Sequence, residues 1–416
     1  MQGAVMKIID GLKYWGQLLL LPIYWLSFLM PRDRRIWLFG STFGRRFADN
    51  PKYFYLYLSQ HRRELGVRPV WLSHSREIVE SIRMADGGRG IYEAYYYHSL
   101  KGIWYALRGK LYLFDNYSKD INFWQSGGAV KVNLWHGVGN KRINYDNAFD
   151  FVRHPKNIWE RFKYFPRRLS DEKSGHYVLA TSPVMCRIFA GAFRVPETHV
   201  IEAGYPRNDY ILGGMIQNVY SAEEERALAT LLCWKEDGKR IVFYMPTFRD
   251  TEAEFAEIMD LQAFNGFLEE SGLLFLVKLH PKSRLKSAFA QFKYSNILVL
   301  DAAADPYIFL KHTDVLVTDY SSVYSDFMLL DRPVVAFQYD YEDYCTKTRD
   351  GYFDFREYMP ELRAENMEEL MDGIRKALKE DTAKKKRAAS REKMFSGRKA
   401  DGCRKLYEKC LQLAKC

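Results

Sequence analysis

The sequence predicts an α/β protein made of two Rossmann-type domains, each with a parallel sheet, that face a cleft. Short apolar runs rich in β-branched residues alternate with segments of helical periodicity along most of the chain. Several of these runs are followed directly by a polar turn, as expected of βαβ units. The 416 residues suffice for two or three domains, and a hydrophobic content of 47% allows a large core.

The first half of the chain begins with an uncharged apolar segment, 14–30 (YWGQLLLLPIYWLSFLM). It is shorter than the ~20 residues that a spanning helix needs, and Pro22 interrupts it. We expect it to lie in the inner leaflet of a membrane; a short span and a buried helix are the alternatives. Strands and strand ends are then predicted at 35–39, 69–72, 110–114, 130–135 and 177–182, with a helix over 51–59.

The second half repeats the alternation and places a polar turn after three of its strands. Strands are predicted at 240–244, 273–278, 297–300, 315–317 and 334–337, and helices at 221–234, at 303–311 and from residue 366 onward. The turns read MPTFRD, KLHP and TDYSS. Because the carboxyl ends of parallel strands meet at one edge of a sheet, these turns are expected to converge.

The converging turns carry residues that suit a diphosphate. Arginine and lysine supply charge, while hydroxyls and the free N–H groups of a helix start supply hydrogen bonds. The residues are Thr247, Arg249, Lys278, His280, Ser321 and Ser322. The two serines have an ordinary alternative as helix N-caps.

The first half offers a histidine between a strand and a flexible turn. His136 follows the strand in VNLWHGVGNK, where it can act as acid or base near neutral pH or simply bond to backbone. Arg207, held by Pro206, can pair with phosphate, and Asn208 and Gly137 are further candidates for phosphate or acceptor contact. The Gly-x-x-x-Gly spacing in GSTFG is a weak signal alone.

A net charge of +10 favours an anionic partner: nucleic acid, anionic lipid or a phosphorylated substrate. Segment 152–170 (VRHPKNIWERFKYFPRRLS) interleaves cations with aromatics, which suits a membrane surface or an exposed basic helix; no nucleic-acid motif accompanies it. With segment 14–30 it predicts peripheral attachment to the cytoplasmic face of the membrane. Predicted membrane contacts are Trp15, Tyr24, Trp25, Trp159, Arg161, Lys163, Arg167 and Arg168.

Several enzyme classes lack their motifs in this chain. There is no P-loop, no G-x-G-x-x-G after a strand, no H-E-x-x-H and no G-x-S-x-G. The six cysteines are scattered, without C-x-x-C, and the three in the C-terminal tail have no histidine nearby. Reduced thiols and no zinc site are therefore expected.

Five segments in this order resemble the CDP-glycerol glycerophosphotransferase family, which includes teichoic acid primases and polymerases: NLWHG, AGYPRND, YMPTFRD, VKLHP and VTDYSSVYSDFMLLDRPVVAF. FGSTFGRRFADNPKYFYLYL and YDYEDYCTKTRDGYFDF also resemble family signatures. The similarity runs from about Trp37 to about Phe355, and the order of the motifs makes it more specific than any one of them. Two departures are a long basic segment between WHG and ATS and no counterpart of the extra N-terminal domain of long polymerases.

The resemblance implies a GT-B-type fold. It also implies transfer of glycerol phosphate, or in some branches ribitol phosphate, from a CDP-activated donor to a lipid-linked acceptor. His136 and His280 match the two family histidines regarded as important for activity. Asp319, with the two serines after it, matches the donor-site signature, and Thr247 and Arg249 match the PTFR segment. No cofactor is firmly implied, although Mg²⁺ is compatible with the chemistry, and no residue is assigned to a metal.

The implied reaction is attack of an acceptor hydroxyl on the β-phosphorus with loss of CMP. We assign His136 as the acceptor-side base and His280 to the donor diphosphate, roles that can be exchanged. The expected division is 1–34 membrane-associating, 35–215 acceptor domain, 216–365 donor domain and 366–416 basic helices. The rival functions are a CDP-ribitol transferase, a nucleotide-sugar glycosyltransferase of the same fold, and a non-catalytic membrane-bound assembly scaffold.

Overall fold

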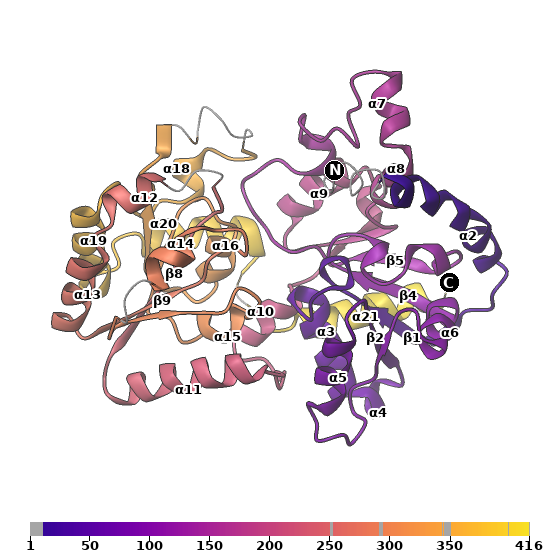
Figure 1. Ribbon diagram of the computed structural model, residues 1–416, viewed down its shortest axis with the longest axis horizontal. Coiled ribbons are helices and arrows are strands. Elements are labelled where there is room, and N and C mark those ends of the chain that lie inside the picture. Colours follow the sequence, from indigo (N-terminus) through magenta and orange to yellow (C-terminus); the bar gives the residue numbers. More distant parts are fainter. Residues whose placement is uncertain are drawn as a thin grey trace, which may run out of the picture. The chain divides into compact units, whose positions relative to one another are not determined.

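The computed structural model describes residues 11–249, 253–290, 294–342, 344, 351–397 and 399–415. The chain forms two compact units, each with its own sheet (Figure 1). The first comprises residues 1–136, 143–219 and 399–416, and the second residues 137–142 and 220–398. Residues 137–142 lie in the first half of the sequence but belong to the second unit. The last helix lies at the end of the sequence but belongs to the first unit.

The first unit contains a seven-stranded parallel sheet in the order β3-β2-β1-β4-β5-β6-β7. Its strands are β1 (Asp33–Phe39), β2 (Arg68–Ser73), β3 (Ala94–Tyr96), β4 (Gly109–Phe114), β5 (Val130–Asn133), β6 (Tyr177–Ala180) and β7 (Val200–Glu202). Five of them were expected from the sequence. The strand expected over 130–135 ends at Asn133, because Trp135 adopts a left-handed backbone with φ of 50°.

Several α-helices accompany this sheet in the first unit. They are α2 (Leu21–Ser27), α3 (Asp49–Gln60), α4 (Arg62–Leu65), α5 (Arg76–Met84), α6 (Leu100–Arg108), α7 (Ile158–Lys163), α8 (Phe165–Asp171), α9 (Pro183–Phe193), α10 (Pro206–Ile211) and α21 (Gly402–Lys415). Single 3₁₀ turns are η1 (Gln17–Leu20), η2 (Thr42–Gly44), η3 (Ser118–Asp120), η4 (Phe123–Gln125), η5 (Asn144–Asp146) and η6 (Glu197–His199).

The last helix, α21, packs against the sheet of the first unit (Figure 1). The ring of Tyr407 lies 5.8 Å from that of Trp37 on β1. Asp209 accepts hydrogen bonds from the N–H groups of Gly402 (3.0 Å) and Cys403 (2.7 Å), which start the helix. A Cβ at Gly402 would lie 2.4 Å from the carbonyl oxygen of Gly204, so this junction requires glycine.

The second unit contains a six-stranded parallel sheet in the order β10-β9-β8-β11-β12-β13. Its strands are β8 (Arg240–Met245), β9 (Leu273–Val277), β10 (Ile297–Val299), β11 (Val315–Thr318), β12 (Val334–Phe337) and β13 (Leu362–Ala364). Its helices are α11 (Ala222–Glu236), α12 (Ala253–Ile258), α13 (Leu261–Glu270), α14 (Leu285–Ala290), α15 (Tyr307–Leu310), α16 (Val323–Met328), α18 (Phe355–Tyr358), α19 (Met367–Lys379) and α20 (Lys384–Phe395).

Both faces of this second sheet are buried, which explains its continuous apolar strands. Val242 and Tyr244 point to a cluster that contains Phe264 and Ile374, whereas the intervening Phe243 is equally buried on the opposite face. The helix expected over 303–311 is confined to α15. Asp301 and Asp305 bond the N–H groups two residues ahead of them, and these turns occupy the start of the expected helix.

The apolar N-terminal segment forms short helices rather than one long one. η1 and α2 cover residues 17–27, with Pro22 in the first turn of α2. The end of α2 is fixed to the unit, since Ser27 is buried and its hydroxyl accepts the N–H of Gly127 at 2.8 Å. Among the residues that the structure describes, no helix has both the length and the apolar character needed to cross a bilayer.

A buried ion cluster supports α16 in the second unit. Arg387 on α20 is fully buried and donates to Glu361 (2.7 and 2.9 Å) and to Asp381 (2.7 and 2.6 Å). Glu361 also accepts the hydroxyl of Tyr324, on α16, at 3.0 Å. Removing the cation would leave two carboxylates without their counter-charge.

We expect Arg387→Met to lower the free energy of unfolding by about 3–5 kcal/mol, because it breaks a buried charge cluster. The exposed pair between Arg226 and Glu223 on α11 is the control, and Arg226→Met should cost less than about 1 kcal/mol. Urea denaturation followed by fluorescence measures both. Equal losses in the two variants would contradict the role given to the buried cluster.

Candidate functional site

The three polar turns of the second unit begin side by side. The register pairs Thr318 at the end of β11 with Met245 at the end of β8, and Tyr244 with Val277 of β9. The carboxyl ends of β8, β9 and β11 therefore meet at one sheet edge, as expected from the sequence. In open α/β sheets this edge is the usual place for a ligand.

Arg249 ties two of these turns to a third segment. Its guanidinium donates to Asp319 in the DYSS turn at 2.7 Å and makes a two-pronged contact with Asp340, which follows β12. Asp319 in addition accepts the backbone N–H of Thr247 at 2.8 Å. The turns after β8, β11 and β12 are thus held by one half-buried cation between two carboxylates.

Burial and charge oppose each other in this ion cluster. Burial alone would raise the pKa of Asp340, but hydrogen bonds from Arg249 and Tyr320 outweigh it and lower that pKa. Burial would likewise lower the pKa of Arg249, but hydrogen bonding to Asp340 and the charge of Asp319 raise it. Arg249 and Asp340 therefore stay charged at neutral pH.

Thr247 and His280 supply polar groups beside this cluster. The hydroxyl oxygen of Thr247 is buried and has no hydrogen-bond partner among the described residues. The ring of His280 packs against Phe248, with centroids 4.8 Å apart, and its Nδ1 accepts the N–H of Lys282. A buried unpaired hydroxyl is costly by itself, so the Thr247 oxygen is suited to meet a ligand.

Ser321 and Ser322 do not cap α16 with their side chains. Ser322 is the N-cap residue but has a helical backbone, and no side-chain cap bond forms. The alternative reading of these serines as ordinary caps therefore does not hold for Ser322, which is exposed. Lys278 is placed differently from the serines, because its ammonium donates to the carbonyls of Asp301 and Ala302 at 3.3 and 2.7 Å.

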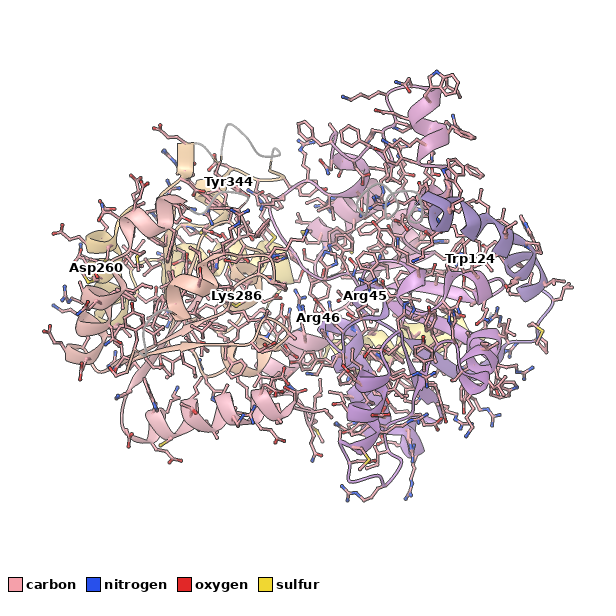
Figure 2. All side chains as sticks on the ribbon, viewed as in Figure 1. Arg45, Arg46, Trp124, Asp260, Lys286 and Tyr344 are labelled. Atoms are coloured by element: carbon pink, nitrogen blue, oxygen red, sulfur yellow. The ribbon has the colours of Figure 1, made fainter. Side chains whose placement is uncertain are left out.

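Residues 137–142 also belong to this second unit and extend the candidate site. Asn140 exchanges hydrogen bonds with the backbone of Phe353 (3.0 and 2.7 Å), and Lys141 forms an antiparallel bridge with Gly351. The Lys141 ammonium lies 5.1 Å from the ring of Tyr344, which Figure 2 labels. That ring stacks on Tyr320 of the DYSS turn at 3.4 Å.

His136 lies at the carboxyl end of β5 in the first unit and is exposed. Its Nδ1 is 3.1 Å from the carbonyl oxygen of Asp115, and a carbonyl can only accept. The proton therefore lies on Nδ1, and Nε2 is the basic nitrogen. The backbone bond expected as the ordinary alternative is therefore present, and the role of His136 as an acid or base stays a prediction.

Arg207 and Asn50 hold the backbone around His136. Arg207 is 1% exposed and donates to the carbonyl of His136 (2.8 Å) and to Asp49 (2.6 Å). Asn50 donates to the carbonyl of Trp135 at 2.8 Å. Asn208 is buried, and the structure shows no partner for its amide among the described residues. The arginine expected at a phosphate thus positions the histidine loop.

Strained backbone gathers near this histidine. Trp135 and Asp49 have φ of 50° and 62°, and Thr42 and Phe43 in the loop after β1 are also left-handed. Non-glycine residues in this region cost free energy and are enriched at functional sites. The buried Asp115 accepts from Ser41, and burial together with the charge of Asp49 raises the pKa of Asp115.

Sequence reasoning missed Asp340, Tyr320, Asn140 and Asp115 as parts of the two clusters. The first two lie within or beside segments whose resemblance was noted, whereas the last two carry no local signal. In the part of the chain that the structure describes, no group of three His, Cys, Asp or Glu residues could hold a metal ion.

A family model and several curated relatives match most of this chain. The family of CDP-Glycerol:Poly(glycerophosphate) glycerophosphotransferase matches residues 23–412. A teichoic acid poly(glycerol phosphate) polymerase of Bacillus spizizenii is 26% identical over 379 residues, spanning 86% of this chain and 88% of the relative. A teichoic acid glycerol-phosphate transferase of Staphylococcus aureus is 25% identical, spanning 81% and 82%.

Solved structures show the same fold. The wall teichoic acid polymerase TagF matches with a TM-score of 0.71 at 20% identity, covering 99% of this chain and 98% of that chain. A variant of it soaked with CDPG matches with a TM-score of 0.70. The fold is therefore TagF-like and of GT-B type, as the resemblance implied.

We expect Thr247→Val to raise the free energy of unfolding by about 1 kcal/mol, because it removes a buried hydroxyl that has no partner. Thr318→Val is the matched control. The hydroxyl of Thr318 donates to the carbonyl of Met245 at 2.7 Å, so its removal should lower that free energy by about 1–3 kcal/mol. Urea denaturation gives both values, and losses in both variants would show that the Thr247 hydroxyl is bonded.

Proposed function

The chain belongs to the CDP-glycerol:poly(glycerophosphate) glycerophosphotransferase family, and we propose that it transfers glycerol phosphate from CDP-glycerol to a lipid-linked acceptor hydroxyl. The proposed products are CMP and an acceptor extended as part of a teichoic-acid-like or capsular poly(alditol phosphate). The observation that carries the proposal is the sheet edge of the second unit. There Arg249 joins the MPTFR turn to the DYSS turn, and the buried Thr247 hydroxyl has no partner among the described residues.

The donor diphosphate is assigned to this edge. Ser321 and Ser322 offer hydroxyls from the turn whose Asp319 bonds the N–H of Thr247, and the ring of His280 packs against Phe248 in the neighbouring turn. Arg249 offsets part of the negative charge of Asp319 and Asp340, which weakens the repulsion between these carboxylates and the phosphates. Lys278 raises the positive potential from the adjoining loop rather than by a contact of its own.

The transfer step needs a base more than an acid. The acceptor oxygen attacks the β-phosphorus, the bond from that phosphorus to the oxygen of CMP breaks, and CMP leaves as a stable anion. His136 accepts the proton of the attacking hydroxyl through Nε2, while its Nδ1–H stays on the Asp115 carbonyl. Arg207, through the His136 carbonyl, holds the loop in place.

Transfer of ribitol phosphate is the main alternative within the family, because ribitol-phosphate polymerases are also among the relatives. Incubation with CDP-glycerol, CDP-ribitol or UDP-N-acetylglucosamine and a lipid acceptor tests the proposal directly. Release of CMP with CDP-glycerol alone supports it. CMP from CDP-ribitol alone, UDP from the sugar nucleotide, or no product from any donor would each overturn it.

Peripheral attachment to the cytoplasmic face of the membrane is part of the proposal. The two segments expected to contact lipid lie together, since the hydroxyl of Tyr14 donates to the carbonyl of Lys163 at 2.8 Å and the rings of Trp15 and Phe162 are 4.9 Å apart (Figure 1). Large exposed apolar side chains on these segments are Leu19, Ile23, Trp25, Leu26, Phe28, Leu29, Ile158, Trp159 and Phe162. Such a surface suits insertion at the interface.

Some of the predicted membrane residues contact other protein groups and are therefore less available to lipid. The ring of Tyr24 stacks on Phe123, with centroids 4.9 Å apart. Arg167 and Arg168 pair with Asp171 and Glu172, respectively, one turn further along α8. We therefore assign insertion mainly to the exposed apolar side chains, and electrostatic attraction to Arg161 and Lys163.

We expect His136→Ala to lower kcat by about 10²–10⁴ while the Kd for CDP-glycerol stays unchanged, because the lost group acts on the acceptor. His199→Ala, a histidine elsewhere in the same unit, is the control. The rate of CMP release gives kcat, and titration calorimetry with CDP-glycerol gives Kd. Wild-type turnover in His136→Ala would remove the base assignment, and loss of donor binding would move this residue to the donor site.

We expect Leu29→Ser and Ile158→Ser each to weaken binding to phosphatidylglycerol vesicles about tenfold or more, since each leucine-sized side chain contributes roughly 1.5–3 kcal/mol when buried. Leu232→Ser, on the exposed side of α11 in the other unit, is the matched control. Co-sedimentation measures the partition. Equal partition of all three variants would place the membrane surface elsewhere, and resistance of the full chain to alkaline carbonate extraction would contradict peripheral attachment.

A further inference from the structure

The second unit contains a large cavity that the donor site does not use. It is an open hollow of about 820 Å³ at the surface, within the range of about 300–1,000 Å³ typical of ligand sites, and Arg356, Lys386 and Lys393 in its lining are exposed. Its walls come from α18, from the start of β13 and from α20. The turns after β8, β9 and β11, which hold the donor residues, contribute nothing to its lining.

Basic side chains dominate the charged lining of this cavity. They are Arg356, Arg363, Lys386 and Lys393. The structure describes no ion pair for Arg356 or Lys386, and the guanidinium of Arg363 lies over the ring of Tyr341. The lining has two acidic residues: Glu361 is paired with Arg387, and the exposed Glu357 leaves one negative charge against four cations. The cavity therefore attracts an anion.

The spacing of the cations favours an extended anion. Lys386 and Lys393 are seven residues apart on α20, which places them on one face about 10.5 Å apart along the helix axis. Arg356 and Arg363 add charge from two other elements. Aromatic and apolar side chains fill the rest of the wall, and the ring of Phe353 lies under the ammonium of Lys393 at 4.2 Å. The carbon segments that separate the charges of such an anion would pack against these aromatic and apolar side chains.

The cavity adjoins the helix that carries the donor turn. The hydroxyl of Tyr358, in the cavity wall, lies 2.6 Å from that of Ser325 on α16, three residues beyond Ser322. Phe353, which also lines the cavity, accepts a hydrogen bond from the Asn140 side chain through its carbonyl oxygen. A molecule in the cavity would thus lie close to α16, which follows the DYSS turn, without contacting the donor residues.

We propose that this cavity binds the growing poly(alditol phosphate) chain, through several of its phosphodiesters at once. The inference rests on the proposed function, which supplies a polyanionic product with short carbon segments between its charges. It adds a binding site for the chain itself, apart from the lipid end and from CDP-glycerol. A phospholipid headgroup carries the same phosphodiester chemistry, so the experiment has to separate the two sources.

The test measures binding of a lipid-free oligo(glycerol phosphate) of several units by calorimetry. The double variant Arg356→Gln with Lys386→Gln should weaken it at least about tenfold, as should Ala389→Trp, which fills the cavity without changing charge. Lys379→Gln with Lys385→Gln removes the same charge from α19 and α20 outside the cavity and should bind as the wild type does. CDP-glycerol affinity and thermal stability should match the wild type in all variants.

The outcomes separate this site from the proposed function. Tighter binding of the oligomer than of glycerol phosphate, lost in both cavity variants, supports the proposal even if no CMP is released from CDP-glycerol, a result that would overturn only the function. Unchanged oligomer affinity in the cavity variants overturns the site. Loss of binding to phosphatidylglycerol vesicles, with oligomer binding intact, also overturns it and assigns the cavity to a lipid headgroup.

Discussion

The bridge from Arg249 to Asp319 and Asp340 is the contact on which the candidate donor site depends. Without it, the turns after β8, β11 and β12 would place two carboxylates at the edge where a diphosphate is to bind. With it, one cation offsets part of their charge, and Asp319 is held where it accepts the N–H of Thr247. An arginine is suited to this task because its planar fork can contact two carboxylates at once and stays charged when half-buried.

Support for that edge comes from behind α16. Arg387 bonds Glu361, which in turn accepts the hydroxyl of Tyr324, so that the helix following the DYSS turn is fixed by a buried charge cluster. Such clusters are weak contributors to net stability but costly to break, and they hold one arrangement of their elements. The cavity is lined in part by the same cluster. The hydroxyl contact made by Ser325 on α16 therefore connects the proposed chain-binding site to the donor turn.

Much of the fold could be predicted from the sequence because buried parallel strands are continuous apolar runs, as at 240–245 and 315–318. The three-residue strands β3, β7 and β13 were not predicted, whereas the equally short β10 was, because it lies in the wholly apolar run ILVL. The donor turns were predicted from their place after strands. Asp340 was not, because it meets Arg249 from 91 residues away. The assignment of residues 137–142 to the second unit likewise depends on contacts such as Asn140 with Phe353 that no local pattern encodes.

The most direct test of the account is calorimetric titration of CDP-glycerol into the wild type and into Arg249→Lys. A lysine keeps the charge but cannot bridge both carboxylates. The account predicts saturable binding of CDP-glycerol, at least about tenfold weaker in Arg249→Lys, and no comparable binding of UDP-N-acetylglucosamine. Equal affinity for CDP-glycerol in the two proteins, or tighter binding of the sugar nucleotide, would contradict it.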